Sequence, residues 1–261
     1  MPDPHAALSR IGQIVRRADP DRFLTALFAP AAQREALFTL YAFNVELSRA
    51  RDVASSPVVA MIRLQWWREV VDGAVRAHEV AMPLSALLDE GQLDRAELNS
   101  VVDAREAEAD TIETLDDWRA FLLAGPGGLA MAAARLLGAE ASDAVRQAGA
   151  AYGLAGVLRS VPALASRGRC LLPEAVLAEH GMSIEGVVAE PANPRLRPAL
   201  AVLAKQAGPW LAAAHTVRGS AVPACLPAVL ARRDLRNPGD SRPRGLRDRL
   251  AITKAALLGR V

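Results

Sequence analysis

The chain has 261 residues and a mass of 27.7 kDa; 51% of its residues are hydrophobic and 23% are charged. This composition excludes a disordered chain, and a formal net charge of only +2 argues against nucleic acid as a partner. Because the length suits one large domain with its own core, we expect a single domain over residues 1–261. Alanine is abundant, favours helices and disfavours strands, so we expect an all-α fold.

Helical periodicity is present along most of the chain. In chain order, helices are expected over residues 31–52, 58–78, 94–110, 116–138 with a kink or break at Pro126, 143–162, and 173–181 closing at Gly181. Ser55 or Ser56 before Pro57 is typical of a helix cap and first turn. With two or three more helices in the last third, we expect eight or nine in total.

Metal, secretion and membrane-span signals are weak. Cys170 and Cys225 lie far apart, and no histidine lies at a metal-ligand spacing from them, so we expect no metal site and reduced thiols in a cytoplasmic protein. The first 23 residues have no apolar core of the secretory kind. The longest uncharged run, residues 120–134, is too short to span a bilayer.

A polar face stands out on the first long predicted helix. Tyr41, Asn44, Ser48 and Asp52 recur every three or four residues in LYAFNVELSRARD, which places them on one side. An ordinary amphipathic helix with this side in solvent explains the spacing equally well. We therefore keep both a pocket wall and a solvated face open.

This stretch resembles the first aspartate-rich helix of the squalene/phytoene synthase superfamily, which reads roughly YAxxRxxDDxxD. The Tyr-Ala pair corresponds to Tyr41 and its neighbour, and the last aspartate to Asp52. The two adjacent aspartates correspond to Ser48 and Arg49, and the arginine of the motif to Val45. The resemblance thus implies a helix that has lost its Mg²⁺-binding carboxylate pair.

A second stretch, residues 152–181, resembles the second motif of the same superfamily, roughly QxxNIxRDxxED followed by a basic residue. Arg159 and Arg169 correspond to its two basic positions. The metal-binding aspartates correspond to Ser160 and Leu164, while Gly153 and Gly156 replace the motif's glutamine and asparagine. The resemblance implies that the two helices face each other, with Tyr41, Asn44, Ser48, Asp52, Arg159 and Arg169 as vestigial pocket residues. Asp52, Arg159 and Arg169 are expected to form one polar cluster.

The runs DPDRFLTALFAP, LYAFNVELSRARD and IRLQWWREVVDG resemble one branch of the superfamily, that of mitochondrial complex I assembly factor 6 and its bacterial relatives. The resemblance covers roughly residues 10–260. It implies an isoprenoid (terpenoid) synthase-like helical domain around a central cavity. It also implies a non-catalytic assembly or chaperone-like factor for respiratory complex I, with complex I subunits or assembly intermediates as partners.

Two other functions stay open. An active prenyl transferase would condense farnesyl or geranylgeranyl diphosphate, with Mg²⁺ neutralising the leaving diphosphate. An isoprenoid- or lipid-binding protein would keep the cavity without the chemistry. The loss of both carboxylate sets favours a protein without catalytic residues or a cofactor, because Mg²⁺ prefers carboxylate ligands.

Three further features have two interpretations each. The acidic run around Asp103, Glu106 and Asp110 is expected to be a solvated helix face rather than a substitute metal site. Of the tryptophan pair, Trp66 is expected in the core. From residue 231 the chain has nine basic and three acidic residues, a net charge of +6. Its last helix is expected to pack on the bundle, the alternative being peripheral contact with the inner membrane.

Overall fold

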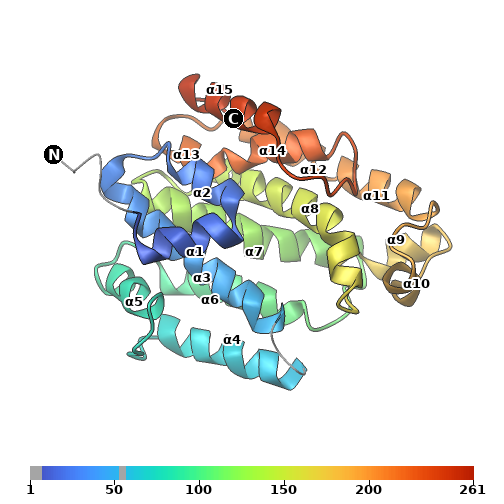
Figure 1. Cartoon of the computed structure of the whole chain (residues 1–261), viewed down its shortest axis with the longest axis horizontal. Coiled ribbons are helices and arrows are strands. Elements are labelled where there is room, and N and C mark those ends of the chain that lie inside the picture. The colour runs from blue at the N-terminus through green and yellow to red at the C-terminus, as the bar shows by residue number, and fades with distance from the viewer. Residues whose placement is uncertain (1–7, 53–56) are drawn as a thin grey trace.

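A computed structural model describes residues 8–52 and 57–261, and within those ranges every regular element is helical (Figure 1). The predicted all-α class is confirmed. The helices are α1 (Arg10–Ala18), α2 (Pro20–Ala26), α3 (Arg34–Asp52), α4 (Pro57–Val71), α5 (Ala81–Asp89), α6 (Arg95–Ala107), α7 (Leu115–Leu136), α8 (Asp143–Ala165), α9 (Glu174–Glu179), α10 (Ile184–Ala189), α11 (Leu196–Lys205), α12 (Ala207–Ala214), α13 (Val222–Cys225), α14 (Pro227–Asp234) and α15 (Leu246–Leu257).

The helices outnumber the eight or nine expected, because short breaks divide segments that periodicity alone joins. Asp19 ends α1 and caps α2 with its side chain, which accepts from the backbone N–H of Arg22 at 3.0 Å. Pro227 begins α14 directly after α13. The cap expected at Ser55 or Ser56 lies outside the described residues.

The two longest helices, α7 and α8, pack against each other through the centre of the fold. Of the kink or break expected at Pro126, the break is wrong, because α7 continues through this residue. A Cβ atom on Gly149 would lie 2.4 Å from the carbonyl oxygen of Pro126, and one on Gly153 would lie 2.2 Å from its Cγ atom. The carbonyl of Pro126 thus lies against Gly149 and its ring lies against Gly153, so these two glycines let α8 approach α7 closely.

The remaining helices surround this pair, and two groups of them form opposite ends of the molecule (Figure 1). In that view α4 and α5 lie at one end, α14 and α15 lie at the other, and α3, α7 and α8 run between them. Trp67, rather than Trp66, is the buried member of the tryptophan pair, because Leu64 and Val70 share its inward face of α4. In the described part of the chain, no helix combines the length and apolarity needed to cross a bilayer.

Candidate functional site

A cavity of about 1230 Å³ lies between α3 and α8 and is bordered by the start of α2 and by residues 243–252. The prediction that the two motif-like helices face each other across a cavity is confirmed. All the replaced motif positions line it: Val45, Ser48 and Arg49 on α3, and Gly153, Gly156, Ser160 and Leu164 on α8. Arg159 and Arg169, which match the motif's basic positions, line it as well.

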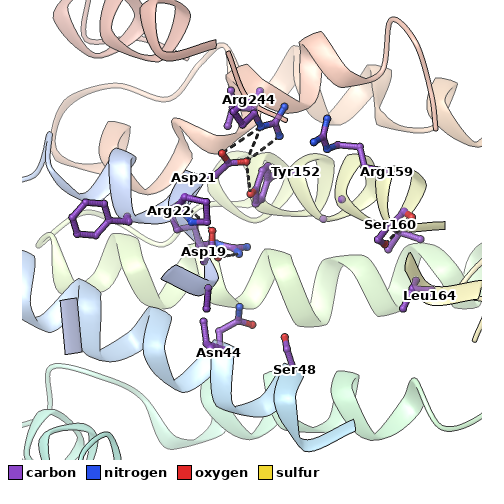
Figure 2. A pocket seen from close by; sticks show the side chains of 18 of the residues that line it. Asp19, Asp21, Arg22, Asn44, Ser48, Tyr152, Arg159, Ser160, Leu164 and Arg244 are labelled. Atoms are coloured by element: carbon purple, nitrogen blue, oxygen red, sulfur yellow. Dashed lines mark hydrogen bonds and ion pairs between the residues drawn. The ribbon is translucent and has the colours of Figure 1, made fainter. Parts of the chain in front are cut away.

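The α3 wall carries two of the predicted pocket residues. Asn44 is buried and accepts a hydrogen bond from Nη2 of Arg105 at 2.9 Å, while Ser48 lies one turn further along (Figure 2). Arg49 pairs with Glu46 on the same helix at 3.0 Å. The side chain of Asp52 lies outside the described part of the structure.

Tyr41 lies in the core and does not line the large cavity, because α1 and α2 cover that part of α3. The guanidinium of Arg22 lies 5.9 Å from its ring and 4.9 Å from the ring of Tyr152. Arg22 is also paired with Asp19 at 2.8 Å. The predicted pocket tyrosine therefore lies behind Arg22, an arginine of the cavity wall, and contacts it by a cation–π interaction.

A first ionic cluster, which we call the Glu108 cluster, joins α6 to the segment after α8. Glu108 follows directly after α6, and its side chain is only 5% exposed. Nη1 of Arg105 lies 2.6 Å from Oε1 of Glu108, and Nη2 of Arg169 lies 2.7 Å from Oε2. Arg105 also reaches Asn44 on α3, so the Glu108 cluster ties three segments together at one end of the cavity.

The rest of the acidic run lies outside the cavity, and Asp110 is exposed beyond the end of α6. Asp103 and Glu106 both pair with Arg68 of α4, at 2.6 and 2.8 Å, and contribute nothing to the cavity. Glu108 differs because the helix ends there and its carboxylate turns inward. The residue sequence alone gives no signal for this, since Arg169, its second partner, is 61 residues away.

A second ionic cluster, the Arg244 cluster, joins α2, α8, α14 and the segment before α15 (Figure 2). Arg244 holds Asp21 at 3.0 Å and, through Nη2, Oδ2 of Asp234 at 2.8 Å. Arg159 lies 3.3 Å from Asp234 and donates to two backbone carbonyls, those of residues 240 and 242. The hydroxyl of Tyr152 donates to Asp21 at 3.1 Å.

These contacts bear on the expected polar cluster of Asp52, Arg159 and Arg169. Arg159 contacts Asp234 and Arg169 contacts Glu108, so among the described side chains the two arginines do not share a carboxylate. The part of the expected cluster that involves Asp52 lies outside the described side chains.

Burial raises the pKa of Tyr152 well above its ordinary value, and the carboxylates of Asp19 and Asp21 raise it further. The cations of Arg22 and Arg244 act in the opposite direction but do not outweigh these effects. Tyr152 is therefore a neutral hydrogen-bond donor on the cavity wall at neutral pH. Burial likewise raises the pKa of Tyr41.

The cavity does not fit a magnesium–diphosphate site of the kind the fold family implies. Among the described residues, nine arginines and four carboxylates line it, and the carboxylates of Asp19, Asp21, Glu108 and Asp248 all contact arginines. Within residues 8–52 and 57–261, no group of three histidine, cysteine or acidic side chains is placed to hold a metal ion. The chemistry of the lining favours an anion over a cation.

Two solved structures with this arrangement of helices are synthases. The chain matches a dehydrosqualene synthase in complex with ligand with a TM-score of 0.78, covering 95% of this chain and 94% of that one at 16% identity. It matches squalene synthase HpnC from Alicyclobacillus acidocaldarius with a TM-score of 0.67, covering 95% and 92%, also at 16% identity. At this identity the likeness establishes the fold, and it confirms the expected terpenoid synthase-like architecture.

Curated relatives carry a different name. The chain is 27% identical over 227 residues to "NADH dehydrogenase (ubiquinone) complex I, assembly factor 6" of Bos taurus, which covers 84% of this chain and 68% of the relative. The Homo sapiens protein of the same name is 26% identical over the same lengths. The family model for squalene/phytoene synthase matches residues 15–237, most of the chain, and the protein belongs to the squalene/phytoene synthase family.

Proposed function

We propose that this protein is a non-catalytic member of its family that acts as an assembly factor for respiratory complex I. The observation that carries the proposal is the composition of the cavity wall. Ser48, Arg49, Ser160 and Leu164 line the cavity at the positions where the superfamily motifs have metal-binding aspartates. The relatives are named as complex I assembly factors, and these names suggest complex I assembly as the process in which this protein acts.

The replaced residues matter because ionising an allylic diphosphate develops several negative charges on the leaving group. Bound Mg²⁺ ions normally neutralise these charges, and a loss of a few kcal/mol of such stabilisation slows a reaction a hundredfold or more. The four carboxylates of the cavity already contact arginines, so they are poorly placed to substitute. The partners under this proposal are complex I subunits or assembly intermediates.

The direct test is to delete the gene and measure NADH dehydrogenase activity in isolated membranes. We expect the activity to fall, together with the amount of fully assembled complex I, while the other respiratory activities stay at wild-type levels. Reintroducing the wild-type gene should restore both. Unchanged complex I in the deletion strain would contradict the proposed role.

The competing activity is prenyl transfer, and it is tested on the purified protein. With farnesyl or geranylgeranyl diphosphate and either Mg²⁺ or Mn²⁺, we expect no condensation product. Squalene, phytoene or a cyclopropyl diphosphate intermediate above the no-enzyme control would overturn the non-catalytic assignment.

A second function, binding of an isoprenoid or another lipid, is favoured by the size and lining of the cavity. Its apolar wall includes Phe23, Phe121 and Ile252, and its volume of about 1230 Å³ exceeds that of a typical small-molecule pocket. Mass spectrometry of lipids extracted from the purified protein tests this. A stoichiometric apolar molecule would support it, and an empty extract would count against it.

The role of Asp52 is tested by thermal melts of wild type and Asp52→Ala, with and without Mg²⁺ and pyrophosphate. As a structural remnant that pairs with an arginine, Asp52 should contribute to stability, and the variant should melt several degrees lower under all conditions. Ligand-dependent stabilisation of the wild type that vanishes in the variant would instead show a retained metal–diphosphate site.

A further inference from the structure

The last helix, α15, has an apolar stripe that faces away from the molecule. Leu246, Leu250 and Leu257 are 71%, 58% and 80% exposed. At 3.6 residues per turn they fall within an arc of about 40° on the helix surface. The helix packs on α14, as expected, but these three leucines face away from the bundle.

The opposite side of α15 holds the helix on the protein. Ile252 is buried and lines the cavity, and Asp248 pairs with Arg233 of α14 at 2.8 Å. Asp248 also accepts from the backbone N–H of Gly245 at 2.9 Å and so caps the helix. The helix is thus anchored by one side, which leaves the leucine stripe without a covering element in the described part of the chain.

Basic side chains border the stripe. Every exposed charged residue from 242 to 260 is basic: Arg242, Arg247, Arg249, Lys254 and Arg260. On the helical projection, Arg247 and Lys254 lie on one flank of the stripe and Arg249 lies on the other. The two acidic residues nearby, Asp240 and Asp248, are held by Arg242 and Arg233.

We propose that α15 docks the protein on an anionic membrane surface, with its leucine stripe in the headgroup region and its basic flanks against lipid phosphates. An apolar stripe between cations is the pattern by which a helix lies in the plane of a membrane interface. Each basic side chain near an anionic leaflet adds roughly a fivefold gain in partitioning. The inference extends the proposed function by naming the surface that brings the protein to a membrane-bound complex. Only this link to complex I rests on the proposed function, whereas the binding of α15 to lipid does not.

A second copy of the chain fits the stripe less well. Two copies face to face would bring the basic flanks of both helices together, which is unfavourable. The stripe is also only about 18 Å long and one side chain wide. The area it could bury is therefore well below the roughly 800 Å² per partner of a stable interface.

The test uses the full-length protein and sedimentation with vesicles of phosphatidylcholine mixed with phosphatidylglycerol. Wild type should bind these vesicles, should bind phosphatidylcholine alone at least tenfold more weakly, and should be released by high salt. The variant L246Q/L250Q/L257Q should bind at least tenfold more weakly than wild type, and R247E/K254E should lose most of its preference for anionic lipid. All five positions are exposed, so the melting temperatures should stay unchanged.

The matched control is V58Q/I62Q on α4. Val58 and Ile62 are 67% and 63% exposed, and α4 lies at the opposite end of the molecule (Figure 1). This control should bind anionic vesicles within about twofold of wild type, since on our proposal α4 does not touch the membrane.

Three results would overturn the inference. They are no binding of wild type to anionic vesicles, equal binding by the leucine variant, or a wild-type dimer in light scattering that the leucine variant converts to a monomer. None of these results bears on the deletion experiment, because vesicle binding is measured without complex I. Conversely, normal complex I in the deletion strain would contradict the proposed function but not the docking of α15 on a membrane.

Discussion

The two ionic clusters at the cavity use arginines in different ways. In the Glu108 cluster, two arginines approach a single carboxylate that is 5% exposed. In the Arg244 cluster, one arginine spans two carboxylates, Asp21 and Asp234, and the neighbouring Arg159 adds bonds to backbone carbonyls. Among the described residues, the first cluster thus has one acidic group, whereas the second distributes its charge over two.

The largest effect is expected from Glu108→Gln. The change leaves Arg105 and Arg169 facing a neutral amide in a buried site, and losing one member of such a pair costs about 3–5 kcal/mol. For a chain of this length we expect the melting temperature to fall by roughly 10 °C. Glu46→Gln is the control, because Glu46 pairs with the half-exposed Arg49 and such pairs contribute at most about 1 kcal/mol. Equal losses in the two variants would contradict the importance of burial.

A smaller loss is expected from Asp234→Asn. Arg244 keeps Asp21, and Arg159 keeps its two carbonyl partners, so the loss should be closer to that of one charged hydrogen bond, about 1.5–3 kcal/mol. Denaturant melts of Asp234→Asn beside Glu108→Gln measure the contrast directly. A larger loss for Asp234→Asn would show that the Arg244 cluster, and not the Glu108 cluster, depends on one carboxylate.

Tyr152→Phe should destabilise the protein by about 1 kcal/mol. It removes a 3.1 Å hydrogen bond to Asp21 but leaves that carboxylate with Arg244 and keeps the ring beside Arg22. Urea unfolding can resolve this difference. A loss as large as that of Asp234→Asn would mean that the hydroxyl, not the second carboxylate, stabilises the cluster.

The smallest effect at neutral pH concerns the protonation of the chain's two tyrosines, Tyr41 and Tyr152. The native pKa of each lies above the unfolded value of about 10, mainly through burial. Native protein therefore binds more protons at alkaline pH. The contribution to stability is complete below about pH 10 and is lost as the pH rises through the native pKa.

Near-ultraviolet absorption of the phenolate follows this titration. Native protein should show almost none as the pH passes the ordinary tyrosine range, and unfolded protein should show the full signal for two residues. Early appearance of half the signal in native protein would mean that one tyrosine is exposed, and Tyr152→Phe identifies which.

Helical periodicity predicted the two helices that contain Asn44, Ser48 and Arg159, because that spacing is local. That these helices face each other across a cavity was implied by the family resemblance, since the spacing alone left a solvated face open. The inward turn of Glu108 and the meeting of Asp21 with Arg244 depend on contacts 61 and 223 residues apart, which no local period encodes. Trp66 and Trp67 show the same limit, since adjacent aromatic residues leave the choice of core face to packing.

The long reach of Arg244 has a consequence for biosynthesis. Asp21 leaves the ribosome early, but its partner is made 223 residues later, a delay of roughly ten to fifty seconds at ordinary rates of translation. Until then the growing chain has α3 and then α8 without residues 243–252, which border the cavity between them. This part of the cavity wall is therefore added only once residues 243–252 have left the ribosome, and a chain that stops before them would lack it.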